Sequence, residues 1–107
     1  KIIGQYELAL AEFKEAEKFG YNWKNNLENL KKVIEVYKIF EDYTNLAPLY
    51  EKAVELDPKD ADLWGNLADV YAALGKVEKA REAALKLLEL KPEKASDVEK
   101  FLKDLGY

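Results

Sequence analysis

Residues 64–75 read WGNLADVYAALG, and the spacing of their apolar side chains decides the fold. These side chains fall at i, i+3, i+4, i+7 and i+10, which places them on one face of an α-helix: Trp64, Leu67, Ala68, Tyr71 and Leu74. Asp60 precedes the pattern as a helix N-cap, and Gly75 supplies the left-handed residue that ends a helix. The stretch therefore predicts a helix that begins just after Asp60.

A second apolar face follows directly, and a proline closes it. Its members also have helical spacing: Val77, Ala80, Ala84, Leu87, Leu88 and Leu90. Pro92 disfavours helical geometry in the residue before it, so this helix should end there. Residues 61–94 are thus predicted to form a helical hairpin.

The same hairpin pattern occurs 34 positions earlier in the chain. Identical residues recur at this offset: Val36 and Val70, Tyr37 and Tyr71, Lys52 and Lys86, Glu55 and Glu89, Leu56 and Leu90, Pro58 and Pro92. Within 27–60 we expect a first helix, a turn near residues 41–44, and a second helix with Pro48 close to its start. A period of 34 indicates a repeat architecture of stacked helix pairs.

The flanks add one helix at each end. Residues 5–19 have the pattern of the second helix of a preceding repeat, and Gly20 would cap it. Residues 95–106 are predicted to form a terminal capping helix, opened by a capping box of Ser96 and Glu99 and ended by Gly106. The prediction is one all-α domain over 1–107 with about six helices: a half repeat (5–20), two repeats (27–60 and 61–94) and the capping helix.

These residues resemble the tetratricopeptide signature in identity and spacing. The match consists of Trp64, Leu67, Ala68, Tyr71, Gly75, Ala80 and Pro92 in one unit, and Tyr37, Tyr50, Ala53 and Pro58 in the other. The resemblance implies a right-handed α-solenoid of antiparallel helix hairpins. The family has small residues where this chain has Ile34, Leu46 and Leu87. The pair Tyr50 and Ala53 becomes Ala84 and Leu87, so large and small side chains have exchanged places while the core volume is roughly held.

The composition argues against catalysis and against several classes of partner. The chain has no histidine or cysteine, and its single serine and threonine are explained as cap and turn residues. The acidic stretch around Pro58 lacks the pattern of a calcium loop, so we expect no metal and no cofactor. A net charge of −4 without a basic stripe argues against nucleic acid. No apolar run approaches the roughly 20 residues of a membrane helix, and nothing in the sequence fixes a compartment for this segment.

The resemblance also implies where a partner would bind, because the first helix of each hairpin lines the concave groove of such domains. The groove positions carried over from the family are Glu28, Lys31, Glu35, Lys38, Asp62, Gly65, Asp69, Ala72, Glu99 and Lys103, together with Ser96. Their summed charge favours a neutral or mildly basic peptide or partner helix. We therefore expect a non-catalytic scaffold for protein–protein interaction.

Some members of the family hold a C-terminal carboxylate with a clamp of basic and amide side chains. Lys31, Asn66 and Lys100 fall on clamp positions, the last with lysine in place of arginine. Glu35 and Ser96 stand where the clamp has asparagine and lysine. Because Glu35 would repel a carboxylate, the clamp is not expected here.

Two alternatives remain at the level of sequence. The chain could associate with itself, since the apolar face of residues 5–19 lacks its hairpin mate. It could also be an accessory domain of a larger protein, because repeats that end in such a helix are similar to the soluble tails of some membrane-bound polysaccharide polymerases and ligases. The first residue is Lys1 rather than methionine, so we expect a piece of a longer chain.

Overall fold

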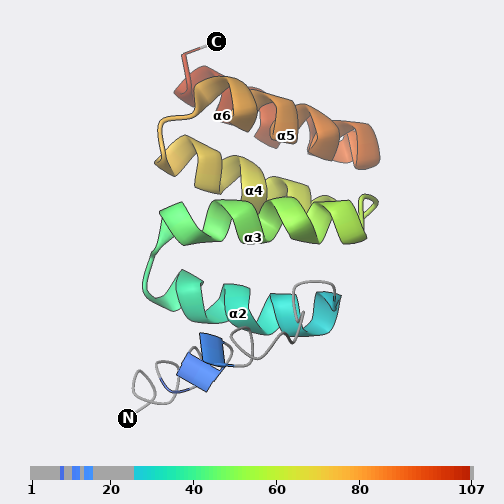
Figure 1. The fold of residues 1–107 in the computed structure, drawn as a ribbon. Coiled ribbons are helices and arrows are strands. Elements are labelled where there is room, and N and C mark those ends of the chain that lie inside the picture. The colour runs from blue at the N-terminus through green and yellow to red at the C-terminus, as the bar shows by residue number, and fades with distance from the viewer. Residues whose placement is uncertain (1–7, 9–10, 13, 16–25, 107) are drawn as a thin grey trace.

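The computed structural model describes residues 8, 11–12, 14–15 and 26–106. Over this part of the chain it contains five α-helices in a stack (Figure 1), namely α2 (Leu27–Ile39), α3 (Tyr43–Leu56), α4 (Ala61–Ala73), α5 (Val77–Leu90) and α6 (Ala95–Asp104). The all-α solenoid of helix hairpins is confirmed, and the described part of the chain has five helices with assigned bounds rather than the expected six or so. The expected helix over 5–19 lies largely outside the described residues, and its five described positions are helical.

The first hairpin is formed by α2 and α3, and both helices begin at side-chain caps. The Asn29 amide N–H donates to Asn26 Oδ1 at 3.1 Å, and the Asn45 amide N–H donates to Asp42 Oδ1 at 3.3 Å. The cap at Asp42 starts α3 earlier than the sequence suggested, so Pro48 lies inside the helix rather than near its start. The turn between the helices contains Glu41 with a left-handed backbone, φ 53°.

The second hairpin is formed by α4 and α5, and it follows the sequence prediction more closely. Asp60 caps α4, because its Oδ1 accepts the Asp62 amide N–H at 3.1 Å. Gly75 has φ 76° in the turn that follows. The helix α5 ends at Leu90, two residues before Pro92, as predicted from the restriction that proline places on its predecessor.

The entry into α6 corrects the predicted capping box. A short 3₁₀-helix, η2 (Pro92–Lys94), runs directly into α6, whose N-cap position is Lys94. Ser96 therefore already lies within the helix, and no side-chain hydrogen bond caps α6. A serine with helical backbone cannot occupy the extended N-cap conformation that the capping box requires. Gly106, with φ 101°, follows the helix end as expected.

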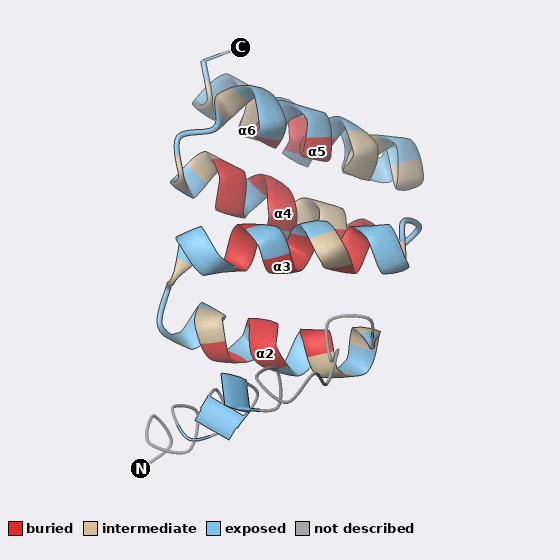
Figure 2. Cartoon of the chain, in the orientation of Figure 1, coloured by how far each residue is buried: buried red, intermediate tan, exposed pale blue. Residues whose placement is uncertain are grey.

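The apolar faces of successive helices meet in one continuous core (Figure 2). Each described helix packs on the next along the chain, which is the arrangement of a repeat stack. Leu30, Val33 and Leu46 are the largest side chains that are fully buried. Trp64, at the second repeat's signature position, is half-buried, and its indole N–H donates to the Pro58 carbonyl at 2.8 Å. This bond ties the start of α4 to the link from α3.

Candidate functional site

One cavity of the described residues lies between α4 and α6, and we call it the α4–α6 groove. Its volume is about 500 Å³, within the range of ligand-binding clefts. The lining is mixed, with an apolar floor and a polar rim: Ala61, Asp62, Gly65, Asn66, Ala68, Asp69, Ala84, Leu87, Lys94, Asp97, Val98 and Phe101. Because α4 and α6 start successive repeats, the groove lies along the first-helix side of the stack.

The floor of the groove is formed where α4 approaches α5. A Cβ built on Gly65 would lie 3.5 Å from Leu87 Cδ2, an ordinary van der Waals distance. Leu87 is the large member of the pair that replaces Tyr50 and Ala53 of the first repeat. The glycine thus lies beside the enlarged side chain and leaves an open, apolar surface above it.

Three carboxylates from α4 and α6 line the groove, and their partners differ. Asp62 lies 3.8 Å from Lys91 Nζ, and Asp97 lies 3.9 Å from Lys94 Nζ. Asp69 has no ion pair and no side-chain hydrogen bond with any residue in the described part of the chain. Partial burial raises the pKa of the Asp69 carboxyl. Asp69 is therefore an exposed carboxylate that is desolvated in part and has no cation partner in the described part of the chain.

The face of α2 continues this side of the stack. Glu28, Lys31, Glu35 and Lys38 are all exposed on it. Lys31 lies 3.7 Å from Asp60, and Glu35 lies 3.6 Å from Lys38.

The buried hydroxyl of Tyr50 lies in the field of carboxylates from two helices. Tyr50 is 2% exposed, and burial is the main cause that raises its pKa to about 12. The negative charges of Glu35 and Asp69 raise it further. These two carboxylates, from α2 and α4, thus act on the same phenol, and acidic character extends from the groove toward α2.

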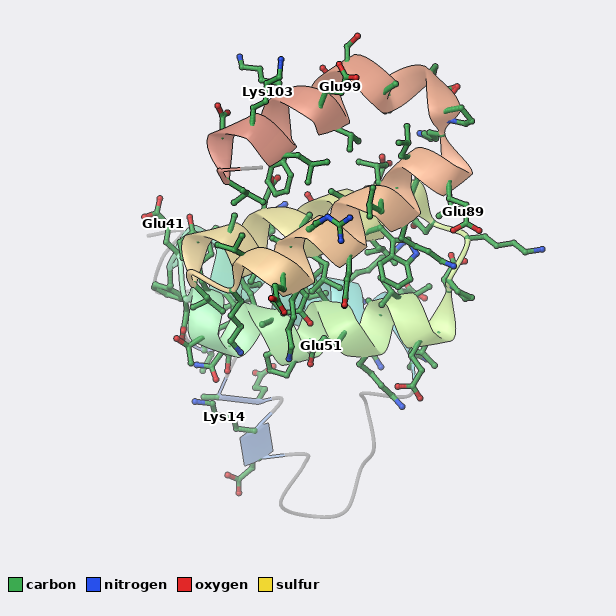
Figure 3. The ribbon with its side chains drawn as sticks, turned by 90° about the horizontal axis from the view of Figure 1, so that it is seen from above. Lys14, Glu41, Glu51, Glu89, Glu99 and Lys103 are labelled. Carbon is green, nitrogen blue, oxygen red and sulfur yellow. The ribbon has the colours of Figure 1, made fainter. Side chains whose placement is uncertain are left out.

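The structure places the remaining predicted groove residues as follows. Asp62, Gly65 and Asp69 come together in the α4–α6 groove, whereas Ala72 is half-buried further along α4 and does not line it. Glu99 and Lys103 are exposed on the side of α6 that points away from the other helices (Figure 3). Ser96 is also exposed and does not line the groove.

Sequence reasoning did not identify the α6 side of the groove. Lys94, Asp97, Val98 and Phe101 contribute it, at a spacing of i, i+3, i+4 and i+7. This is the same face whose apolar members pack on the preceding hairpin. The apolar residues between 98 and 105 already indicate which face of this helix packs against the hairpin. The groove positions carried over from the tetratricopeptide family were Glu99 and Lys103, which lie on another face.

A second cavity of about 480 Å³ opens between α3 and α5 on the opposite side. Trp64, Leu67 and Tyr71 line it, with charged side chains of both signs around them. The Tyr71 hydroxyl donates to the Glu51 carboxylate, and Lys79 Nζ lies 5.7 Å from the centre of the Tyr71 ring. Burial and then the bond to Glu51 raise the pKa of Tyr71. Glu51, Tyr71 and Lys79 thus already contact one another in this cavity.

Two further features are absent from the residues that the structure describes. Within them, no cluster of three or more acidic side chains is arranged to hold a metal ion. No described helix combines the length and the apolar character needed to cross a membrane.

Comparison with protein-family models matches one segment of the chain. Residues 49–82 match the model of the tetratricopeptide repeat, a segment that covers the end of α3, all of α4 and the start of α5. This segment of the chain has the sequence of a tetratricopeptide repeat. Such repeats form non-catalytic protein-interaction scaffolds in general.

Solved structures share this fold at low sequence identity. The first tetratricopeptide domain of Spaghetti (RPAP3), determined with the HSP90 peptide SRMEEVD, superposes with a TM-score of 0.69 at 19% identity. That match covers 97% of this chain and 82% of the other. The MamA protein superposes with a TM-score of 0.54 at 20% identity, over 94% of this chain and 67% of the other. These likenesses support the tetratricopeptide fold for the residues that the structure describes.

Proposed function

We propose that this tetratricopeptide chain is a non-catalytic scaffold that binds a peptide or a partner helix in the α4–α6 groove and along the exposed face of α2. The observation that carries the proposal is the groove itself, an open cavity of about 500 Å³ with an apolar floor and a polar rim. An apolar floor with a few polar groups is the usual character of a binding cleft. Peptide binding by the Spaghetti domain supports the same use of this fold.

The partner differs in charge from the peptide held by Spaghetti. That peptide, SRMEEVD, carries three acidic side chains and one basic side chain. In this chain Lys31, on a clamp position, lies 3.7 Å from Asp60, and Glu35 and Asp69 add negative charge to the same side of the stack. An acidic peptide would lose part of its solvation and would meet Lys31 and Lys94 already paired with Asp60 and Asp97, so we propose a neutral or mildly basic partner.

A peptide selection tests the proposal. The chain is used as bait for a random peptide library, and the selected peptides are titrated against wild type, Asp69→Lys and the control Glu89→Lys. Glu89 is an exposed glutamate of α5 that does not line the groove. We expect Asp69→Lys to weaken binding by about tenfold or more, equivalent to about 1.4 kcal/mol, and Glu89→Lys to leave it unchanged. Equal affinities for the two variants would refute the groove assignment.

Titration with SRMEEVD is a second arm. We expect no saturable binding to wild type. Tight binding of SRMEEVD that survives Asp69→Lys would show that the chain recognises acidic peptides through other residues.

A further inference from the structure

We infer that the α4–α6 groove selects an arginine side chain of its partner, whose guanidinium pairs with Asp69 above the apolar floor. This inference rests on the proposed function and specifies which side chain of the partner the groove recognises.

The unequal pairing of the groove carboxylates gives the first reason. The chain's own lysines lie within ion-pair distance of Asp62 and Asp97, on the rim. Both of these aspartates are strongly exposed, with side-chain exposures of 84% and 77%, so their ion pairs contribute little. Asp69 is exposed as well, but it has no such partner among the described residues, and desolvation of its carboxyl is sufficient to raise its pKa. A cation from a partner would therefore gain more at Asp69 than at either rim aspartate.

The shape of the lining gives the second reason. Gly65 and Leu87 provide an apolar surface close to the backbone of α4, suited to the three methylenes of an arginine stem. Phe101 supplies an aromatic ring on the α6 side of the same groove. A planar guanidinium can stack on an aromatic face and can also bind a carboxylate through two N–H groups, whereas an ammonium ion is a compact point charge. These features favour arginine over lysine.

The surrounding charge gives the third reason. Glu35 of α2 and Asp69 of α4 both raise the pKa of Tyr50, so both carboxylates act on that side chain, and Lys38 lies 3.6 Å from Glu35. Among the described residues that line the groove, Lys94 is the one cation, and it lies 3.9 Å from Asp97. An acidic anchor would therefore meet net repulsion, and an apolar anchor would leave Asp69 partly desolvated and unpaired.

Degenerate peptide pools test the inference. Five pools of decapeptides carry a fixed central arginine, citrulline, lysine, leucine or glutamate between randomised positions, and each is titrated against the chain. Citrulline has nearly the shape of arginine but no charge, so it isolates the ion pair. We expect the arginine pool to bind tightest, with citrulline and leucine weaker by about tenfold and glutamate weakest. In Asp69→Asn the advantage of arginine over citrulline should disappear, and in the control Glu89→Gln it should remain.

The outcomes separate this inference from the proposed function. If all five pools bind with the same affinity through the groove, the arginine preference is wrong while the peptide-binding function stands. A preference for glutamate or leucine would overturn it in the same way. If the preference for arginine persists in Asp69→Asn, the arginine of the peptide binds to other residues and the assignment to Asp69 is wrong. If no pool binds, both the inference and the proposed function fail.

Discussion

Glu41 and Gly75 lie 34 residues apart, at the same position of the two hairpins, and both have left-handed backbone geometry, with φ 53° and 76°. In the second hairpin a glycine meets this requirement without steric cost. In the first hairpin a glutamate adopts it, which costs an L-residue roughly 1–2 kcal/mol. The repeat geometry therefore determines the turn, even where the side chain disfavours it.

Glu41→Gly should stabilise the chain by about 0.5–1 kcal/mol, because glycine removes the left-handed strain at some cost in unfolded-state entropy. Urea unfolding followed by circular dichroism measures the change as a higher midpoint. The reciprocal control is Gly75→Ala, which should lower stability by about 1 kcal/mol. Because a Cβ at Gly75 would meet nothing within 4 Å, that loss would come from the backbone alone. A lower urea midpoint for Glu41→Gly than for wild type would contradict the idea that the backbone at Glu41 is strained.

Gly65→Ala should also stabilise the chain, by up to about 1 kcal/mol, because alanine has the higher helix propensity. The added Cβ would lie 3.5 Å from Leu87 Cδ2 and needs no rearrangement. Thermal unfolding measures the gain. Gly65→Val serves as the comparison, since its β-branched side chain has a lower helix propensity and extends toward Leu87. If alanine destabilised the chain as much as valine does, the space above Gly65 would be smaller than described.

The sequence predicted the stacked hairpins well because two independent signals agreed there. The apolar period fixed one face of each helix, and Asp60, Gly75 and Pro92 marked ends that the structure confirms. The prediction of helix ends was less accurate where it rested on a single residue type. Pro48 suggested a helix start, but the cap at Asp42 begins α3 earlier.

The groove was predicted only in part, for a related reason. Asp62, Gly65 and Asp69 lie on α4, whose positions align directly with those of the tetratricopeptide signature. The α6 side depends on how a terminal helix packs against the preceding hairpin. That packing is a tertiary property, and the spacing of polar residues on α6 alone could not reveal which of its faces turns toward α4.

The buried phenol of Tyr50 makes stability depend on alkaline pH. Its pKa rises from 10.0 in the unfolded chain to about 12 in the folded chain, so the folded state holds the proton more tightly. The stability that this provides is fully present below pH 10 and is lost as pH rises from 10 to about 12, for a total of roughly 2–3 kcal/mol. Wild type should therefore lose more stability over this range than Tyr50→Phe. Chemical unfolding at several pH values measures both, and parallel curves would contradict the assignment.

Asp69→Asn should separate stability from binding. Folding raises the pKa of the Asp69 carboxyl, so the ionised form is disfavoured in the folded state and opposes folding at neutral pH. Asparagine removes this charge, and we expect a stability at pH 7 that is equal to wild type or higher, within the range of about 1 kcal/mol common for such substitutions. Any difference from wild type should vanish as pH falls through the pKa of Asp69, because the wild-type carboxyl is then neutral too.

The same variant should bind the arginine pool about tenfold more weakly. A residue that served only the fold would show the opposite pattern, with stability lost and affinity kept. Thermal unfolding and peptide titration on one preparation therefore decide between the two roles. Glu89→Gln, which makes the same chemical change at an exposed position outside the groove, should alter neither measurement.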